Sequence, residues 1–483
     1  MTRLIVGPFN RVEGDLEVRL DVADGAVRRA EVVSPMYRGF ENLLRGRDPM
    51  DALVIVPRIC GICSVSQSLA AARALAALAG VAPPPNGQLA LNLLAATENA
   101  ADHLTHFYAF FMPDFARPVY AGRPWHAEAL RRHAAEHGEQ TRRAIAARAR
   151  WFELVGVLGG RWPHTHSLQP GGSSRAIDAA ERLRLLARVR EFRAWLEHHL
   201  VGAPLEQLTA LPDAPALQAW GQGGTGGDLR LFLAIAADAG LASLGRGPGR
   251  ALSVGAFPDA QGRPALAPGW WAEGQPLQPL SLDRLTEDAT HAWLADAGGP
   301  RHPAHGLTQP VADKPEAYTW NKAPRLAGQT AETGAVARQL VDGQPLVADL
   351  ARRHGITVLV RVVARVVELA RLVPLMEAWL QALVPREPFA VPLVLPAEGA
   401  AVGLNEAARG ALGHWLRVEG GRLAHYQIVA PTSWNFSPRD GRGQPGPLEQ
   451  ALEGTPVQPG EATPVAVQHV VRSFDPCMVC TVH

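Results

Sequence analysis

The sequence predicts a mainly α-helical protein with peripheral β structure (α+β), in which a bundle of long helices forms the core and the N- and C-terminal segments converge on a buried site. Long segments rich in Ala, Leu and Arg, with apolar residues at helical spacing, predict the bundle. An alternating apolar and polar run near the N-terminus predicts the β structure. Two Cys-x-x-Cys pairs, one near each end of the chain, predict that the two ends lie close together at a common site.

We expect a single domain over residues 1–483, because 47% apolar composition supplies a large core and no clean composition break divides the chain. Four regions are predicted within it. Residues 1–48 hold a β-hairpin, residues 49–200 are helical, residues 201–330 form a Gly- and Pro-rich insert of hairpins and loops, and residues 331–483 are helical before a C-terminal segment that carries two cysteines.

The N-terminal hairpin is predicted from the runs "DLEVRLDV" and "AVRRAEVV". In the first run, apolar side chains alternate with charged ones at Leu16, Val18, Leu20 and Val22. The Asp24-Gly25 pair that follows favours a tight turn. One face of the hairpin is therefore expected to be buried.

The most apolar segment, residues 356–384, predicts an amphipathic helix and not a membrane span. Arg361, Arg365, Glu368 and Arg371 interrupt it at helical spacing and line up on one face. The N-terminal residues lack the basic and apolar order of a secretory signal. The formal net charge of +1 gives no electrostatic reason to expect a nucleic-acid partner. We therefore expect a cytoplasmic protein with no nucleic-acid partner and no membrane span.

The four cysteines form two pairs, Cys60 with Cys63 and Cys477 with Cys480. In a cytoplasmic chain this pattern indicates metal or redox chemistry, and four thiolates suit zinc, an iron–sulfur cluster or nickel. More than 400 residues separate the pairs, unlike the compact knuckle of a zinc ribbon, so we expect the site at the centre of the fold. On spacing alone, two unrelated pairs with packing roles are the alternative.

The residues around both pairs carry a family resemblance. The strings "PRICGICSVSQS" and "SFDPCMVCTVH" resemble the RxCGxC and DPCxxCxxH signatures of the large subunit of nickel–iron hydrogenases. "RVEGDLEV", "YRGFENLLRGRDPMDA", "ADHLTHFY", "YTWNKAPRLAG", "EAARGALGHW" and "VAPTSWNFSPRD" resemble further family segments in the same order.

The resemblance implies roles for the residues of a nickel–iron centre whose iron carries CO and CN ligands. Cys60 and Cys477 would be terminal nickel ligands, and Cys63 and Cys480 would bridge nickel to iron. The glutamate of the RxEG motif, Glu13, would carry the proton away when H2 is cleaved. Otherwise a lone glutamate at a strand edge is a solvated surface charge.

Further matches surround that centre in the family. Arg409 would lie over the open metal position, and Asp102 and Asp475 would hold its guanidinium. Without the motifs, these residues would be read as surface ion pairs. Thr432 would hydrogen-bond a cyanide. Glu41 and the terminal His483 would bind a second cation, usually Mg2+.

Departures from the common pattern resemble the regulatory, hydrogen-sensing subclass. Gln67 stands where a histidine is usual, Ile62 and Phe110 stand where Val and Leu are common, and Ala408 replaces a proline. The bulkier Ile62 and Phe110 would narrow the gas channel, although either residue on an apolar helix is more often simple core. The chain would then be a low-turnover hydrogenase that reports H2 to a histidine kinase.

Partners follow from the cysteine count, because all four thiols are assigned to the active metals and none remains for an electron relay. The family supplies an iron–sulfur small subunit, and its sensing members add a histidine kinase and a dimer of heterodimers. Three other interpretations stay open: an energy-conserving uptake hydrogenase, a quinone-reductase subunit that lacks the four-cysteine set, and a zinc-organised scaffold. The "HAAEH" run, His133 to His137, has the spacing of a zinc helix, but we interpret it as a solvated helical face.

Overall fold

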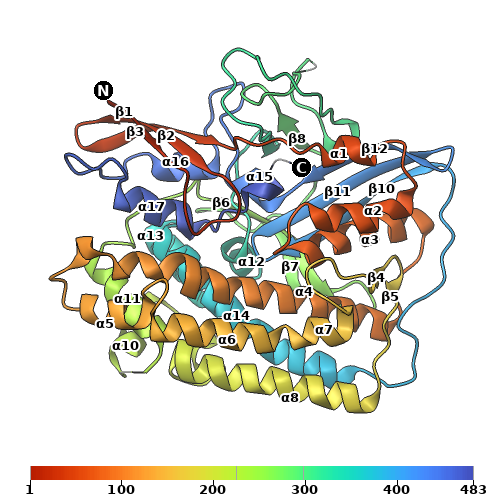
Figure 1. Cartoon of the computed structure of the whole chain (residues 1–483), viewed down its shortest axis with the longest axis horizontal. Helices are drawn as coiled ribbons and strands as arrows, with labels where there is room; N and C mark the ends of the chain where they lie inside the picture. Colours follow the sequence, from red (N-terminus) through yellow and green to blue (C-terminus); the bar gives the residue numbers. More distant parts are fainter. Residues whose placement is uncertain (1, 225, 297, 482) are drawn as a thin grey trace.

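Most of the long helices lie together in the lower half of Figure 1, and the two three-stranded sheets lie in the upper half. This computed structural model describes residues 2–224, 226–296, 298–481 and 483. The longest helices are α3 (Ser64–Ala79), α4 (Pro85–Thr105), α6 (Glu139–Trp151), α8 (Ala179–Trp195) and α14 (Val358–Ala382). The predicted α+β fold class, with long helices at the core, is confirmed.

Shorter helices complete the helical side and connect it to the sheets. They are α1 (Phe40–Leu44), α2 (Ala52–Ile55), α5 (His126–His133), α7 (Glu153–Gly159), α12 (Ala335–Val341), α13 (Pro345–His354), α15 (Pro431–Asn435), α16 (Pro447–Leu452) and α17 (Val465–Ser473). Helix α4 continues into a π-helical turn, His106–Phe111, and a 3₁₀ turn, Met112–Ala116.

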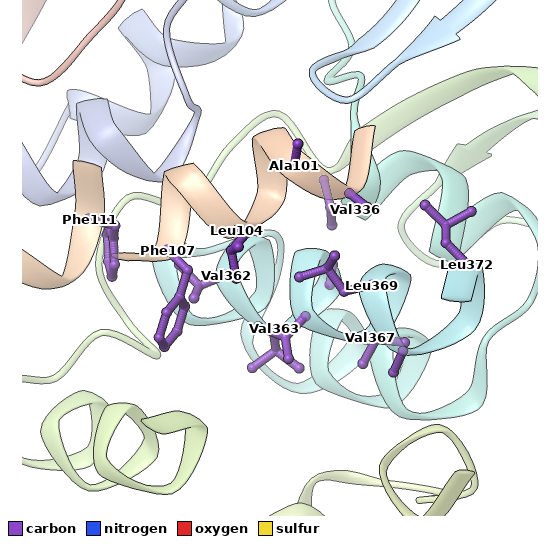
Figure 2. Close-up of a cluster of buried hydrophobic side chains, with 14 of the residues drawn as sticks. Ala101, Leu104, Phe107, Phe111, Val336, Val362, Val363, Val367, Leu369 and Leu372 are labelled. Carbon is purple, nitrogen blue, oxygen red and sulfur yellow. The ribbon is translucent and has the colours of Figure 1, made fainter. Parts of the chain in front are cut away.

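The core is centred on α14, which packs against α4, α8 and α12. Figure 2 shows apolar side chains of α4 and its π-helical extension facing those of α14 and α12. The labelled residues are Ala101, Leu104, Phe107, Phe111, Val336, Val362, Val363, Val367, Leu369 and Leu372, and all of them are buried. Burial of this apolar surface is the main force that holds the helices together.

Most of the charged face of α14 lies inside the protein: Arg361, Arg365 and Glu368 are buried, and the Arg371 side chain is 25% exposed. Arg361 pairs with Glu332 at 2.8 Å, and Glu368 pairs with Arg338 at 2.6 Å. Buried charges are tolerated only when they are paired and hydrogen-bonded, which these pairs achieve. The amphipathic pattern therefore forms an internal polar seam. Among the described helices, none is both long enough and apolar enough to cross a bilayer.

Two three-stranded antiparallel sheets carry segments of the chain toward the cysteines. The first has the order β1 (Thr2–Val6), β2 (Glu17–Ala23), β3 (Ala26–Val33), and the second β10 (Gly399–Ala407), β11 (Gly410–Glu419), β12 (Arg422–Val429). The predicted hairpin is β2–β3, with Val18 and Leu20 fully buried. Strand β1, which the sequence reasoning missed, pairs with β2. Helix α3 packs on β10 and β11.

The Gly- and Pro-rich insert contains helices as well as the expected hairpins. Helices α9 (Leu205–Thr209), α10 (Ala214–Gln222) and α11 (Asp228–Asp238) precede the strands β6 (Arg250–Pro258), β7 (Pro264–Ala272), β8 (Leu285–Asp288) and β9 (Ala323–Leu326). The side chains of Phe232 and Ile235 on α11 are buried, and Asp213 caps α10 by accepting from the Ala216 N–H at 2.8 Å. These short apolar stripes and this cap offset the local glycine content. A two-stranded ribbon, β4 (Leu168–Gln169) with β5 (Gly172–Ser173), precedes the insert.

The "HAAEH" segment is not one helical face, so that interpretation is wrong in its geometry. Helix α5 ends at His133, whose ring is buried against Phe107 and Tyr108. His133 Nε2 lies 3.4 Å from Asp228, whereas the side chain of His137 is 85% exposed in the following turn. The two imidazoles therefore do not converge on one metal.

Candidate metal centre

The four cysteine sulfurs meet in one buried cluster. All four Sγ atoms lie within 4.8 Å of one another, and none forms a disulfide. Cys60 Sγ lies 3.3 Å from Cys477 Sγ, Cys63 Sγ lies 3.3 Å from Cys480 Sγ, and Cys477 and Cys480 are 3.0 Å apart. The predicted convergence of the two ends of the chain is confirmed.

Local backbone structure presents both pairs to one point. Cys63 is the N-cap of α3, and Cys477 precedes the 3₁₀ turn Met478–Cys480. The C-terminal segment runs beside the N-terminal loop, where the Glu13 N–H donates to Pro476 O at 3.2 Å and the Met478 N–H donates to Glu13 O at 2.7 Å. Gly14, at φ +79°, is required here, because a Cβ would lie 2.9 Å from Val479 Cγ1.

The close contact among the four thiols gives them different pKa values. Burial raises the pKa of Cys60, but hydrogen bonds from the other three cysteines outweigh it and hold this pKa well below its usual value. Hydrogen bonds with the same neighbours raise the pKa of Cys63, and burial raises that of Cys477. One thiolate stabilised by neighbouring thiols is the chemistry of a site that releases protons when it takes a metal.

A buried guanidinium holds the C-terminal segment next to the sulfurs. Arg409 Nε donates to Asp475 O at 2.9 Å, its Nη2 donates to Asp475 Oδ1 at 2.9 Å, and its Nη1 donates to Asp102 Oδ2 at 2.6 Å. These bonds hold Asp475 at φ +59°, a left-handed conformation that few non-glycine residues adopt. Burial raises the pKa of Asp102 to about 8, while Arg409 lowers that of Asp475 against the effect of burial.

Glu13 lies at the edge of this cluster. Its backbone forms a parallel bridge with Cys477, and the residue is half-buried. Burial and the neighbouring Cys60 raise the pKa of the Glu13 carboxyl, and Arg409 lowers it. A carboxyl held at the boundary between the metal cluster and the surface can exchange protons in both directions.

Gln67 lies fully buried on α3 and joins a polar chain. His414 Nε2 donates to Gln67 Oε1 at 2.9 Å, and the Tyr426 hydroxyl donates to His414 Nδ1 at 2.8 Å. Burial lowers the pKa of His414 to about 3, so the ring is neutral. Within the described part of the chain, Gln67 Nε2 and Ser433 Oγ have no hydrogen-bond partner. Buried polar groups normally have one, so these two fit a site that holds a further group.

Two more predicted residues come together beside the sulfurs. His483 Nε2 lies 3.4 Å from Glu41 Oε1 and 2.7 Å from Ile428 O, and His483 Nδ1 lies 2.6 Å from Cys480 O. Lys322 Nζ lies 3.8 Å from Glu41 and 3.1 Å from Glu287, so two carboxylates face one ammonium. The carboxylate and carbonyl oxygens and the imidazole are ligand types that suit a hard divalent cation.

The three remaining predicted residues, Thr432, Ile62 and Phe110, are buried or partly buried. Thr432 is buried on α15. Ile62 is partly buried and packs on the apolar cluster that contains the cysteines. Phe110 is not part of that cluster, as far as the described residues show; it is half-buried on the π-helical turn, and its carbonyl accepts from Arg11 Nη1 at 3.3 Å.

Sequence reasoning missed two buried carboxylates that fix the segments of the centre. Asp114 accepts from Arg11 and from Arg472 Nη1 at 2.7 Å, which ties the N-terminal loop to α17. Glu98 on α4 accepts from the N–H groups of Val65 at 2.8 Å and Ser66 at 2.9 Å, directly after Cys63. A glutamate inside an otherwise Ala- and Leu-rich helix was the available signal for Glu98.

The comparison with protein families gives one match over most of the chain. The profile described as "Nickel-dependent hydrogenase" matches residues 38–143 and 229–483. The chain belongs to the nickel-dependent hydrogenase family. The resemblance inferred from the two cysteine motifs is thereby confirmed, and the four buried thiols are the ligand set expected of the hydrogenase active site.

Similar proteins cover the whole hydrogenase chain. It is 30% identical to the periplasmic [NiFeSe] hydrogenase large subunit of Desulfomicrobium baculatum, over 100% of this chain and 95% of that protein. It is 26% identical to the uptake hydrogenase large subunit of Rubrivivax gelatinosus, with 100% and 95% covered. The reduced Ni-Fe-Se hydrogenase of D. vulgaris Hildenborough superposes with a TM-score of 0.86 at 30% identity, over 100% of both chains.

Glu98 generates a prediction for the pH dependence of stability in this hydrogenase. Burial raises its pKa from 4.5 to about 7 although Val65 and Ser66 donate to it, so the folded protein binds more protons than the unfolded chain in this range. The free energy of unfolding should therefore fall as the pH rises from 4.5 toward 7. Glu98→Gln should remove this share of the slope, up to about 3 kcal/mol, as measured by denaturant unfolding across pH.

The control for this experiment is Glu136→Gln, since the Glu136 side chain is 85% exposed. It should leave the slope unchanged. A Glu98→Gln protein whose stability depends on pH as the wild type does would contradict the assignment.

Proposed function

We propose that this chain is the active-site subunit of a nickel–iron hydrogenase that cleaves H2 heterolytically and serves as a hydrogen sensor. The observation that carries the proposal is the cluster of four buried sulfurs within 4.8 Å, with Arg409 and Glu13 beside it. Family membership supports the hydrogenase activity. The sensing role is the finer step.

The cysteines would hold the metals in two roles. Cys60 and Cys477 would be terminal nickel ligands, and Cys63 and Cys480 would bridge to an iron with CO and CN ligands. The pairing of sulfurs across the chain ends, at 3.3 Å in each case, is compatible with this division. Such a centre, when bound, supplies the site at which H2 is separated into protons and two electrons.

The surrounding side chains would position the ligands of the centre and carry the proton away. Arg409, fixed by Asp102 and Asp475, keeps a positive charge next to the sulfurs. Glu13 would receive the proton, because it is half-buried and its raised pKa makes it a better proton acceptor near neutral pH. Thr432 and Gln67 Nε2, which has no partner among the described atoms, would donate hydrogen bonds to ligands at the centre.

A second cation would stabilise the end of the chain. We propose that Glu41, His483 and the carbonyl oxygen of Ile428 bind Mg2+ or a similar ion. These groups are buried. His483 Nε2 lies 2.7 Å from Ile428 O and 3.4 Å from Glu41 Oε1, which supports a shared ion. The backbone ligand carries no side-chain signature, so the sequence could not have indicated it.

Transfer of the two electrons away from the centre requires a second subunit. All four cysteines of the sequence lie in the one cluster, so the chain has no thiols left for an iron–sulfur relay. The relatives are named large subunits, which supports an iron–sulfur small subunit as the partner. The cytoplasmic location stays a prediction, since the Desulfomicrobium relative is named periplasmic.

The sensing role rests on Gln67, Ile62 and Phe110. Gln67 gives an amide where an imidazole is common, and Ile62 adds bulk beside the thiol cluster. We propose a histidine kinase, and a dimer of heterodimers, as the signalling assembly. Uptake of H2 for energy is the second candidate, because the Rubrivivax relative carries that name.

Metal analysis tests the hydrogenase centre directly. We expect nickel and iron at one each per chain, with infrared bands in the CO and CN stretching region. Cys480→Ser should abolish the bands, because one of the two thiolates that would hold the iron is lost. Zinc at one per chain without those bands would establish a zinc-organised scaffold instead.

Glu13→Gln tests the proton role. The variant should keep nickel, iron and the infrared bands, since the backbone contacts of residue 13 hold the C-terminal segment. Hydrogen–deuterium exchange from D2 should slow by at least 100-fold, in the range for loss of a positioned acid or base. Glu17→Gln, on strand β2 of the same sheet, serves as the control. Unchanged exchange in the Glu13 variant would refute the role.

Deletion of the gene in its host separates sensing from uptake. For a sensor, hydrogen-dependent gene expression should be lost, and any loss of H2 consumption should be restored when the strain's other hydrogenases are expressed from a constitutive promoter. Loss of H2 consumption with normal hydrogen-dependent expression would instead assign the chain to uptake.

A further inference from the structure

A basic cavity of about 460 Å³ lies beside the N-terminal loop, apart from the sulfur cluster. The loop from Gly7 to Arg11 forms one wall, and Arg117, Gln468 and Arg472 line another. Its volume is in the range of protein ligand sites. We propose that this cavity binds an oxyanion, either an inorganic anion such as sulfate or phosphate or a carboxylate of a bound polypeptide.

The charges around the cavity do not balance. Arg11, Arg117 and Arg472 all face the single carboxylate of Asp114, and Arg472 Nη1 lies 2.7 Å and Arg117 Nη1 3.9 Å from it. Asp114 itself is fully buried. Among the described lining residues there is no carboxylate, so three guanidinium groups share one negative charge. An anion in the cavity would neutralise part of the excess.

The partly exposed guanidinium of Arg117 offers N–H donors to the cavity. The Arg472 side chain is only 1% exposed and is held in place by bonds from Nη1 to Asp114 at 2.7 Å and from Nη2 to Asn10 Oδ1 at 2.7 Å. The Arg117 side chain is 32% exposed, and its Nη1 donates to Gln468 Oε1 at 3.0 Å. A planar guanidinium suits oxyanions because it offers parallel N–H donors.

A bound anion would influence the metal centre through the backbone. Arg11 lies two residues before Glu13, and Arg472 lies five residues before Cys477. An anion held by both would brace the loop and α17 against each other. The polypeptide source rests on the proposed iron–sulfur partner, whereas the inorganic source does not.

The test titrates sodium sulfate and sodium phosphate into the full-length chain at constant ionic strength, with chloride as the balancing salt. We expect one saturable site by calorimetry, and a rise in the unfolding midpoint as sulfate is added. Arg117→Gln should weaken sulfate binding at least tenfold. Arg117→Lys, which keeps the charge but not the fork, should give an intermediate loss.

Arg142→Gln, at an exposed position of α6, is the matched control and should bind sulfate as the wild type does. No saturable binding, or equal binding by Arg117→Gln, would overturn the proposal. The titration needs no metal, so it stands even if the hydrogenase proposal fails.

The same titration in the complex with the iron–sulfur subunit identifies the source. Retained sulfate affinity assigns the cavity to a free anion. A loss of at least tenfold on complex formation, reversed by removing acidic side chains of the partner one at a time, assigns it to a partner carboxylate.

Discussion

The meeting of two distant segments around four buried thiols is the constraint on which the rest of the structure depends. Closing a loop of more than 400 residues costs conformational entropy, and crowding four sulfurs adds electrostatic cost. The helical core supplies the burial that offsets both. Arg409 then joins the parts, since one guanidinium binds Asp102 of α4 and both the carbonyl and the carboxylate of Asp475.

Other buried carboxylates around the centre also join distant segments of the chain. Asp114 gathers arginines from the N-terminal loop and from α17, Glu368 pairs with Arg338 across α14 and α12, and Glu98 caps α3 directly after Cys63. Each links segments far apart in sequence. Loss of one partner would leave an uncompensated buried charge, which costs about 3–5 kcal/mol. The supports of the centre are therefore charged and enclosed. The three arginines around Asp114 mark the cavity in which we propose that an anion binds.

The candidate site was predictable where a residue type has a specific chemistry within a short motif. The four cysteines converge as expected, Arg409 contacts Asp102 and Asp475, and Glu41 lies beside His483. Asp114 and Glu98 escaped notice because their partners come from distant segments. An acidic residue in an apolar helix signals burial at most and does not identify those partners. The Ile428 carbonyl could not be found at all, since every residue has one. The roles of Glu13, Thr432, Gln67, Ile62 and Phe110 await experiment.

The sequence by itself determined the helical periodicity, the β2–β3 hairpin and the family's ligand set, because these depend on local spacing and on thiol chemistry. Tertiary structure decided the environment of each face. The charged stripe of α14 has the spacing of a solvated surface, yet most of it is buried, because Glu332 and Arg338 from other segments pair with it. His133 and His137 have metal-ligand spacing, yet α5 ends between them and only His133 is enclosed. Spacing fixes which side chains share a face, and only long-range packing fixes what that face meets.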